Sequence, residues 1–209
     1  MFENDYAVNG NGKAVQSPPH PSTNNNLRPA LLEPQISLFG CVSDDMFWSF
    51  KTQLASALRL RGELCLELST TGGDAETGRR IAEEIRICRE YRGRNILFFG
   101  KTFIYSAGVT IMAGFPKEER YLSKDCHLLI HSRRMDKEVH FIGPLSSNVQ
   151  VAEEVLANLK SGLALEHDGF KSLAEGCELS FDEIKKRAAK NWYLTGDEAL
   201  ELGMVHALL

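Results

Sequence analysis

One stretch, residues 95–114, limits what this chain can fold into more than any other. Its first part, residues 95–100, is a short apolar run typical of a buried strand, and residues 106–114 are small and apolar, which is typical of a buried helix. Ser106 lies where this helix begins, and the first turn of a helix has free N–H groups that stabilise a developing oxyanion. Ser106 is therefore a candidate nucleophile, although taken alone it is better explained as a helix N-cap.

Strands and helices alternate on both sides of this stretch. Strands are predicted at residues 35–42, 63–69, 95–100, 120–123 and 126–132, and helices from Asp44, over 79–91 and over 106–114. This order predicts parallel β–α–β units and hence an α/β fold.

The pattern changes after His131. Residues 132–145 are polar and predict a hairpin or a strand standing off the core, and a long helix follows over residues 146–167. The apolar stripe of this helix comprises Val149, Ala152, Val155, Leu156, Leu159 and Leu163. A helix this long packs either against another subunit or across its own core. Ser180 and Thr195 begin two short helices through capping boxes, and residues 203–206 predict a closing strand.

Composition separates a tail from a folded domain. Residues 1–34 contain Asn, Gly, Ser and Pro clusters and few large apolar side chains, so this segment is expected to be a disordered tail or an arm that orders on a partner. Residues 35–209 are expected to form one domain with a sizeable core.

Charge and cysteine content exclude several classes of protein. The net charge is −4 and basic and acidic residues are interspersed, so the sequence gives no reason to expect that the protein binds nucleic acid. The five cysteines form no C-x-x-C pair and sit mostly in apolar runs, as in a reducing cytosol. No apolar run is long enough to span a membrane, and the first residues lack the pattern of a secretory signal. We therefore expect a cytoplasmic protein.

Three groups along the chain fit the requirements of a serine peptidase. Ser106 offers the hydroxyl, Gly73 follows a strand where no Cβ blocks a substrate carbonyl, and the Ala107 N–H is a second oxyanion donor. His131 ends an apolar strand and is a candidate base. His127 and His131 could also suggest a metal pair, but the apolar β-type residues between them and the absence of a glutamate argue against a helical zinc motif. We expect neither a metal nor a cofactor.

Four segments in order resemble the Clp protease proteolytic subunit. The turn STTGGDAETG resembles that family's N-S-P-G-G-S, and GKTFIYSAGVTIMAG resembles its nucleophile segment G-Q-A-A-S-M-G-A. LLIHSR resembles M-I-H-Q-P, with the same interval of 25 residues from serine to histidine. The C-terminal SFDEIKKRAAKNWYLTGDEALELGMV resembles the family's closing helix, D-R-F/Y-L-S and E-A-x-x-x-G-L-V. The resemblance covers residues 35–209.

The resemblance implies both a fold and a site. The fold would be the Clp/crotonase-type spiral of β-β-α units, with the helix at 146–167 as a protruding handle that joins subunits. Ser106 would be the nucleophile, His131 the general base, and Gly73 and Ala107 the oxyanion donors. Family members form rings with internal active sites, so a peptide or unfolded-protein substrate, a homo-oligomeric ring and an ATPase unfoldase partner are implied.

The chain also departs from the family pattern. Asn191 stands where the family has the third catalytic residue, an aspartate, and Thr71 replaces the proline of the glycine turn. An asparagine can accept a hydrogen bond from imidazole but cannot stabilise imidazolium by charge. Asp168 and Asp182 are alternative third members. The region between His131 and the closing helix is about eleven residues longer than in the family.

Four readings of function follow. The leading one is a serine peptidase that acts inside a ring by a Ser-His-(Asn/Asp) mechanism. The second is a scaffold subunit that keeps the ring and has lost turnover. A third is an acyl-CoA enzyme of the crotonase type, which would leave Ser106 and His131 without a role, and a Ser-Lys peptidase using Lys101 is a fourth, unsupported alternative.

Overall fold

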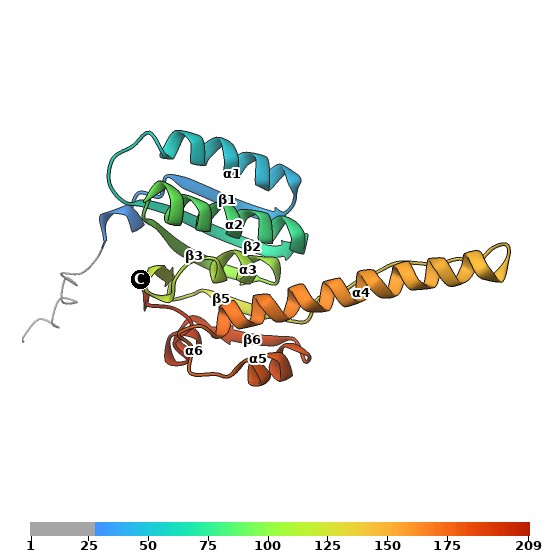
Figure 1. Ribbon diagram of the computed structural model, residues 1–209. Coiled ribbons are helices and arrows are strands. Elements are labelled where there is room, and N and C mark those ends of the chain that lie inside the picture. The colour runs from blue at the N-terminus through green and yellow to red at the C-terminus, as the bar shows by residue number, and fades with distance from the viewer. Residues whose placement is uncertain (1–27) are drawn as a thin grey trace, which may run out of the picture.

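The centre of the molecule is a mixed β-sheet, shown in Figure 1. The computed structural model describes residues 28–209. Over these residues the strands are β1 (Ile36–Val42), β2 (Leu64–Gly73), β3 (Ile96–Tyr105), β4 (Arg120–Leu122), β5 (His127–Ile130), β6 (Trp192–Thr195) and β7 (Ala207–Leu208). The strand order is β1-β2-β3-β4-β7, with β5 paired to β3 and β6 paired to β5. Every pair is parallel except β5–β6.

Six α-helices and two short 3-10 turns connect these strands within residues 28–209. They are η1 (Pro29–Leu31), α1 (Asp44–Ala57), α2 (Ala75–Arg92), α3 (Ala107–Ala113), η2 (Lys117–Glu119), α4 (Leu145–Ala174), α5 (Phe181–Ala188) and α6 (Gly196–Glu201). The α/β class predicted from the alternating pattern is confirmed.

The first parts of the two central strands are buried on both faces, over residues 64–66 of β2 and 96–100 of β3, where the sequence is continuously apolar or glycine. On one face β2 and β3 pack in the main core beneath α1, α2 and α3. On the other face Cys65 and Leu97 belong to a smaller cluster that is closed by Leu31 of η1. The predicted tail over residues 1–34 is therefore packed at its end, because Leu31 is buried and Arg28 pairs with Glu63. The rest of that prediction concerns residues 1–27, which lie outside the described residues.

Strand β3 changes partner halfway along its length. Its first half pairs with β4 at Phe98–Gly100, and its second half pairs with β5 at Phe103–Tyr105. Between them Thr102 has a φ of 61°, which rotates the strand and redirects its hydrogen bonds. The second half of β3 carries the chain directly to Ser106, so this change of partner brings β5 beside the candidate nucleophile.

Parts of the secondary structure differ from the sequence predictions. Residues 132–144 contain no strand, because they run out along α4 rather than turning back on themselves. The strand β6 was not predicted, and it forms by antiparallel pairing with β5. The closing strand is Ala207–Leu208 rather than residues 203–206, which precede it as a turn.

Helix α4 projects from the body of the protein, with its first residues at the far tip (Figure 1). It is longer than predicted, and its buried side chains are Glu166, Phe170 and Leu173, all near its C-terminal end. The predicted apolar stripe is largely exposed, with Leu159 at 44% and Leu163 at 54%. The stripe therefore does not pack across the chain's own core. Within residues 28–209, no helix has the length and hydropathy needed to cross a membrane.

Candidate active site

Ser106 lies at the junction of β3 and α3 in a strained backbone conformation. Its φ is 55° and its ψ is −114°, a region that residues other than glycine rarely occupy and that costs about 1–3 kcal/mol. Its side chain makes no capping hydrogen bond to α3. The N-cap explanation therefore fails, because the hydroxyl makes no hydrogen bond to the helix it precedes. A sharp, strained strand-to-helix turn is the usual way to expose a serine nucleophile.

The glycine turn after β2 lies directly against Ser106. A Cβ on Gly72 would stand 2.7 Å from Cβ of Ser106, and one on Gly73 would stand 2.3 Å from the carbonyl oxygen of Val42. Both glycines also have positive φ, 94° and 146°. Thr70 supports the turn, because its hydroxyl donates to Gly40 O and accepts from the Gly72 N–H. Glycine is thus required at both positions by space and by backbone conformation.

The first turn of α3 offers donors beside the serine. Ala107 is the first residue of α3, and no acceptor for its N–H is found among residues 28–209. Ala107 is packed against Gly78 of α2, where a Cβ would stand 3.0 Å from the Ala107 carbonyl oxygen. The position of this N–H is therefore fixed by close packing of two helices, as an oxyanion donor requires.

His131 follows directly after β5. The Ser106 N–H donates to Leu129 O at 2.8 Å, so the nucleophile and the strand that leads to the histidine are joined by a backbone hydrogen bond. His131 Nδ1 lies 2.7 Å from Ser132 O. That contact suits an Nδ1–H that donates to the carbonyl, which leaves Nε2 as the acceptor that a general base needs. No hydrogen bond joins Ser106 Oγ to His131 in the described part of the chain.

Asn191 is placed by the strand pair β5–β6. Ile130 pairs with Trp192 in this antiparallel ladder, so the next step of the register brings Asn191 opposite His131. The side chain of Asn191 does not reach the imidazole, because its Oδ1 accepts from Arg134 Nη2 at 3.0 Å. Like Ser106, Asn191 has a φ of 55°.

Of the two alternative acids, Asp168 lines the same cleft as Ser106 and His131, and Asp182 does not. Asp168 is an exposed side chain of α4 whose carboxylate is 3.5 Å from Lys171 Nζ. Asp182 is an exposed residue in the first turn of α5, where it lines a shallow surface hollow away from Ser106. Neither is hydrogen-bonded to His131 in the described residues.

Ser106 and His131 line the same large cleft. Its volume is about 1200 Å³, and Ser106, Ala107, Gly73 and His131 all line it. Its walls are formed by α2, α3, the segment after His131 and the C-terminal half of α4. Four of the five predicted catalytic and oxyanion residues are therefore brought together in one cleft from three separate segments of the chain, and Asn191 is not among its lining residues.

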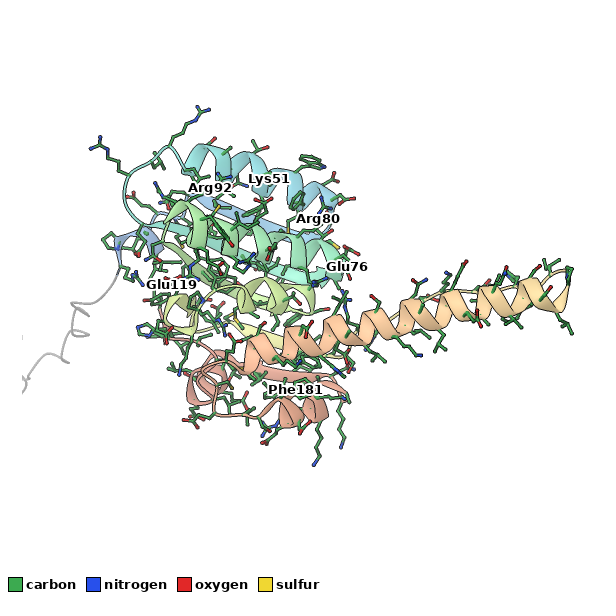
Figure 2. All side chains as sticks on the ribbon, viewed as in Figure 1. Lys51, Glu76, Arg80, Arg92, Glu119 and Phe181 are labelled. Atoms are coloured by element: carbon green, nitrogen blue, oxygen red, sulfur yellow. The ribbon has the colours of Figure 1, made fainter. Side chains whose placement is uncertain are left out.

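Charged residues stand at one end of this cleft, beside the start of α2. Asp74 caps α2, and the hydrogen bond from the Thr77 N–H holds the pKa of the Asp74 carboxyl below its usual value. Glu76, labelled in Figure 2, accepts from Arg133 at 2.7 Å and from Arg79 at 3.0 Å. These pairs link the glycine turn to the segment that carries His131.

One residue of the cleft, Glu166, was not predicted from the sequence to belong to the site. Glu166 is buried at the base of α4 and accepts a hydrogen bond from the Arg133 N–H. The signal was present, because the apolar stripe of α4 continues from Leu159 and Leu163 through position 166 to Phe170. A carboxylate at a stripe position is unusual and would have singled out Glu166.

The structure gives no support to the metal and lysine alternatives. Lys101 forms an ion pair with Glu67 on the sheet and is not among the residues of the cleft. His127 is exposed while His131 lines the cleft, and residues 28–209 contain no cluster of three side chains suited to a metal ion.

Comparison with known proteins defines the family to which the chain belongs and the class of its fold. The structure is similar to that of an asparagine-to-aspartate mutant of ClpP1 from Listeria monocytogenes, with a TM-score of 0.67 and 18% identity over 83% of this chain and 90% of that one. The Clp protease family model matches residues 22–209. The chain belongs to the Clp protease family, and its fold is the ClpP fold.

Curated relatives agree with this assignment at low identity. The ATP-dependent Clp protease proteolytic subunit of Paracoccus denitrificans is 25% identical over 66% of this chain and 62% of its own length. Proteolytic subunit 2 of Pseudomonas aeruginosa is 22% identical over 84% of this chain and 71% of its length. Proteolytic subunit 2 of Treponema pallidum is 23% identical over 84% of this chain and 81% of its own length. The match to the Paracoccus protein thus spans less than two thirds of that relative.

Proposed function

We propose that this protein is a serine endopeptidase in which Ser106 attacks the scissile carbonyl and His131 is the general base. The observation that carries the proposal is the conformation of Ser106, strained and without a capping bond at the mouth of the cleft. A serine that served only as a helix cap would have an extended backbone and a bond to the helix, as Ser43 and Ser180 do in this chain.

The placement of each group supports the following mechanism. Nε2 of His131 takes the proton from the hydroxyl as Ser106 Oγ bonds to the carbonyl carbon, and the N–H groups of Gly73 and Ala107 stabilise the oxyanion. His131 then gives the proton to the leaving amine, and water hydrolyses the acyl-enzyme by the same route. The Ser132 carbonyl fixes the tautomer of the imidazole, a role that an aspartate has in the serine-protease template. Asn191 has a supporting role from the opposite strand.

The natural setting we propose is a homo-oligomeric ring in the cytoplasm. The exposed apolar stripe of α4 is the surface expected to join subunits, and the substrate would be a peptide or an unfolded protein delivered by an ATPase unfoldase. We propose no nucleic-acid, membrane, metal or cofactor partner.

Labelling with a fluorophosphonate tests the peptidase proposal, because only an activated serine reacts. We expect Ser106 of the assembled wild-type protein to be labelled, and Ser106→Ala to abolish labelling. Ser43→Ala is the matched control, since it removes a helix-capping hydroxyl outside the cleft and should leave labelling unchanged. An unlabelled wild type, or a label on another serine, would contradict the assignment.

A scaffold subunit without turnover is the second candidate. It is favoured by the hydrogen bond between Arg134 and Asn191, which leaves the asparagine unavailable to the imidazole. This candidate predicts an oligomer of normal size in which Ser106 is unlabelled. No observation favours the acyl-CoA alternative.

A further inference from the structure

Glu166 is a buried carboxylate in the cleft that the proposed hydrolysis does not use. Its exposed fraction is 8%, and it is the only acidic side chain among the buried residues of the described chain. It lies on the same face of α4 as Phe170 and Leu173, the face that packs on the body of the protein. Burying a carboxylate is costly unless hydrogen bonds or a cation compensate for the lost water.

The structure supplies only part of that compensation. The Arg133 N–H donates to Oε2 of Glu166, and no other hydrogen bond or ion pair of Glu166 is found within residues 28–209. The guanidinium of Arg133 itself turns to Glu76, and that of Arg134 turns to Asn191. The guanidinium groups of both arginines that follow His131 are thus engaged elsewhere, and Oε1 of Glu166, which is not among the fully buried polar atoms without a partner, is open to a cationic group in the cleft.

Part of the lining of the cleft is apolar. Val109 of α3 and Ile130 of β5 line the same cleft as Ser106 and Glu166. A lysine or arginine side chain matches such a space, because its aliphatic stem packs on apolar surface and its charged end needs a carboxylate. A shorter or acidic side chain would leave the carboxylate uncompensated.

We infer that Glu166 forms a specificity subsite that binds a lysine or arginine of the substrate. We place it at the residue before the scissile bond, because the backbone that Glu166 holds is only two residues beyond His131. The inference rests on the proposed peptidase function for turnover, but binding to the subsite does not depend on turnover.

Peptide hydrolysis tests the subsite directly. Fluorogenic peptides that differ only before the scissile bond, carrying Lys, Arg, Met or Glu, are compared by kcat/KM on the assembled protein. We expect Lys and Arg to exceed Met by about tenfold or more, in line with one charge-assisted hydrogen bond in a buried site. Glu166→Gln, which keeps an acceptor for the Arg133 N–H, should lower the Lys-to-Met ratio by about tenfold. Glu178→Gln removes the same charge from an exposed position and should leave the ratio unchanged.

Two outcomes would overturn the inference: a wild-type preference for Met over Lys, or an equal loss for all peptides in Glu166→Gln, which would make Glu166 only a support for the Arg133 segment. If no peptide is cleaved and Ser106 is unlabelled, the peptidase proposal fails. The affinity of the protein for peptides then still tests whether the subsite exists. Fluorescence anisotropy measures how tightly the Ser106→Ala variant binds labelled peptides that end in Lys or in Met. Tighter binding of the Lys peptide that disappears with Glu166→Gln supports the subsite, and equal binding overturns it.

Discussion

Arg134 holds the side chain of Asn191, at a position that the β5–β6 register brings opposite His131. The Arg134 guanidinium donates to the amide oxygen that the imidazole would otherwise use, at 3.0 Å. His131 instead contacts the carbonyl of Ser132. The orientation of the base therefore depends on its own backbone segment, and Arg134 competes with His131 for Asn191.

This competition predicts how substitutions at positions 134 and 191 combine. Asn191→Asp alone should raise turnover only modestly, because the new carboxylate pairs with Arg134. Arg134→Ala with Asn191→Asp should raise kcat by about tenfold or more, since the free carboxylate then stabilises the imidazolium; tenfold is about 1.4 kcal/mol of barrier. Asn191→Ala should cost far less than Ser106→Ala. Peptide hydrolysis by the four variants and the wild type measures these effects.

The matched control is Lys190→Ala, which removes a neighbouring exposed cation without touching Asn191 and should not change the response to Asn191→Asp. If Asn191 substitutions have no effect while Asp168→Ala or Asp182→Ala abolishes turnover, the third catalytic member lies at that aspartate instead.

Gly72 lies so close to Ser106 that adding one methyl group at position 72 should reduce the reactivity of the serine. Gly72→Ala places a Cβ 2.7 Å from that of Ser106, so we expect fluorophosphonate labelling to slow at least about a hundredfold as the serine is displaced. Gly143→Ala is the control, because Gly143 has a similar φ of 98° with nothing within 4 Å of the added Cβ. It shares the backbone strain but not the clash, and labelling should be normal. Equal effects of the two variants would mean that strain alone is responsible.

The exposed stripe of α4 predicts an oligomer held by apolar contacts. Replacing Leu159 and Leu163 with Glu should dissociate the assembly, since each buried leucine contributes about 1.5–3 kcal/mol to such an interface. Analytical ultracentrifugation measures the change, and circular dichroism should show the helix content retained. Asn158→Glu on the same helix is the control and should sediment as the wild type does. A wild-type protein that stays monomeric at all concentrations would disprove the prediction.

The Asp74 cap predicts a loss of stability in acid. Because the folded-state pKa of Asp74 is below its usual value of 3.8, its ionised form stabilises the protein above that pH, and this contribution is lost as the pH falls through the folded-state pKa. Asp74→Asn keeps an acceptor for the Thr77 N–H but does not titrate. Melting temperatures at pH 7, 5 and 3 should therefore show the full wild-type advantage over Asp74→Asn at the two higher values and a smaller one at pH 3. An advantage that is the same at all three would exclude this mechanism.

Local patterns predicted most of the secondary structure. The apolar run before Ser106 and the small residues after it define a buried strand and helix without any tertiary information. The capping box at Thr195 was likewise predicted and is formed, because its hydrogen bonds join residues only three apart. Strand β6 was missed because its four residues become a strand only through pairing with β5, about sixty residues earlier.

In the candidate site, too, some features were predictable from the sequence and others depend on the tertiary structure. The sequence by itself determined the residue types and their order: a serine before a helix, a pair of glycines, a histidine after a strand and an asparagine in place of an aspartate. Only the tertiary structure decided that Ser106 is strained and uncapped, that Arg134 binds Asn191, and that Glu166 is buried in the cleft. The reason is physical: strand and helix signals arise from neighbours along the chain, whereas side-chain partners and burial depend on segments that only folding brings together.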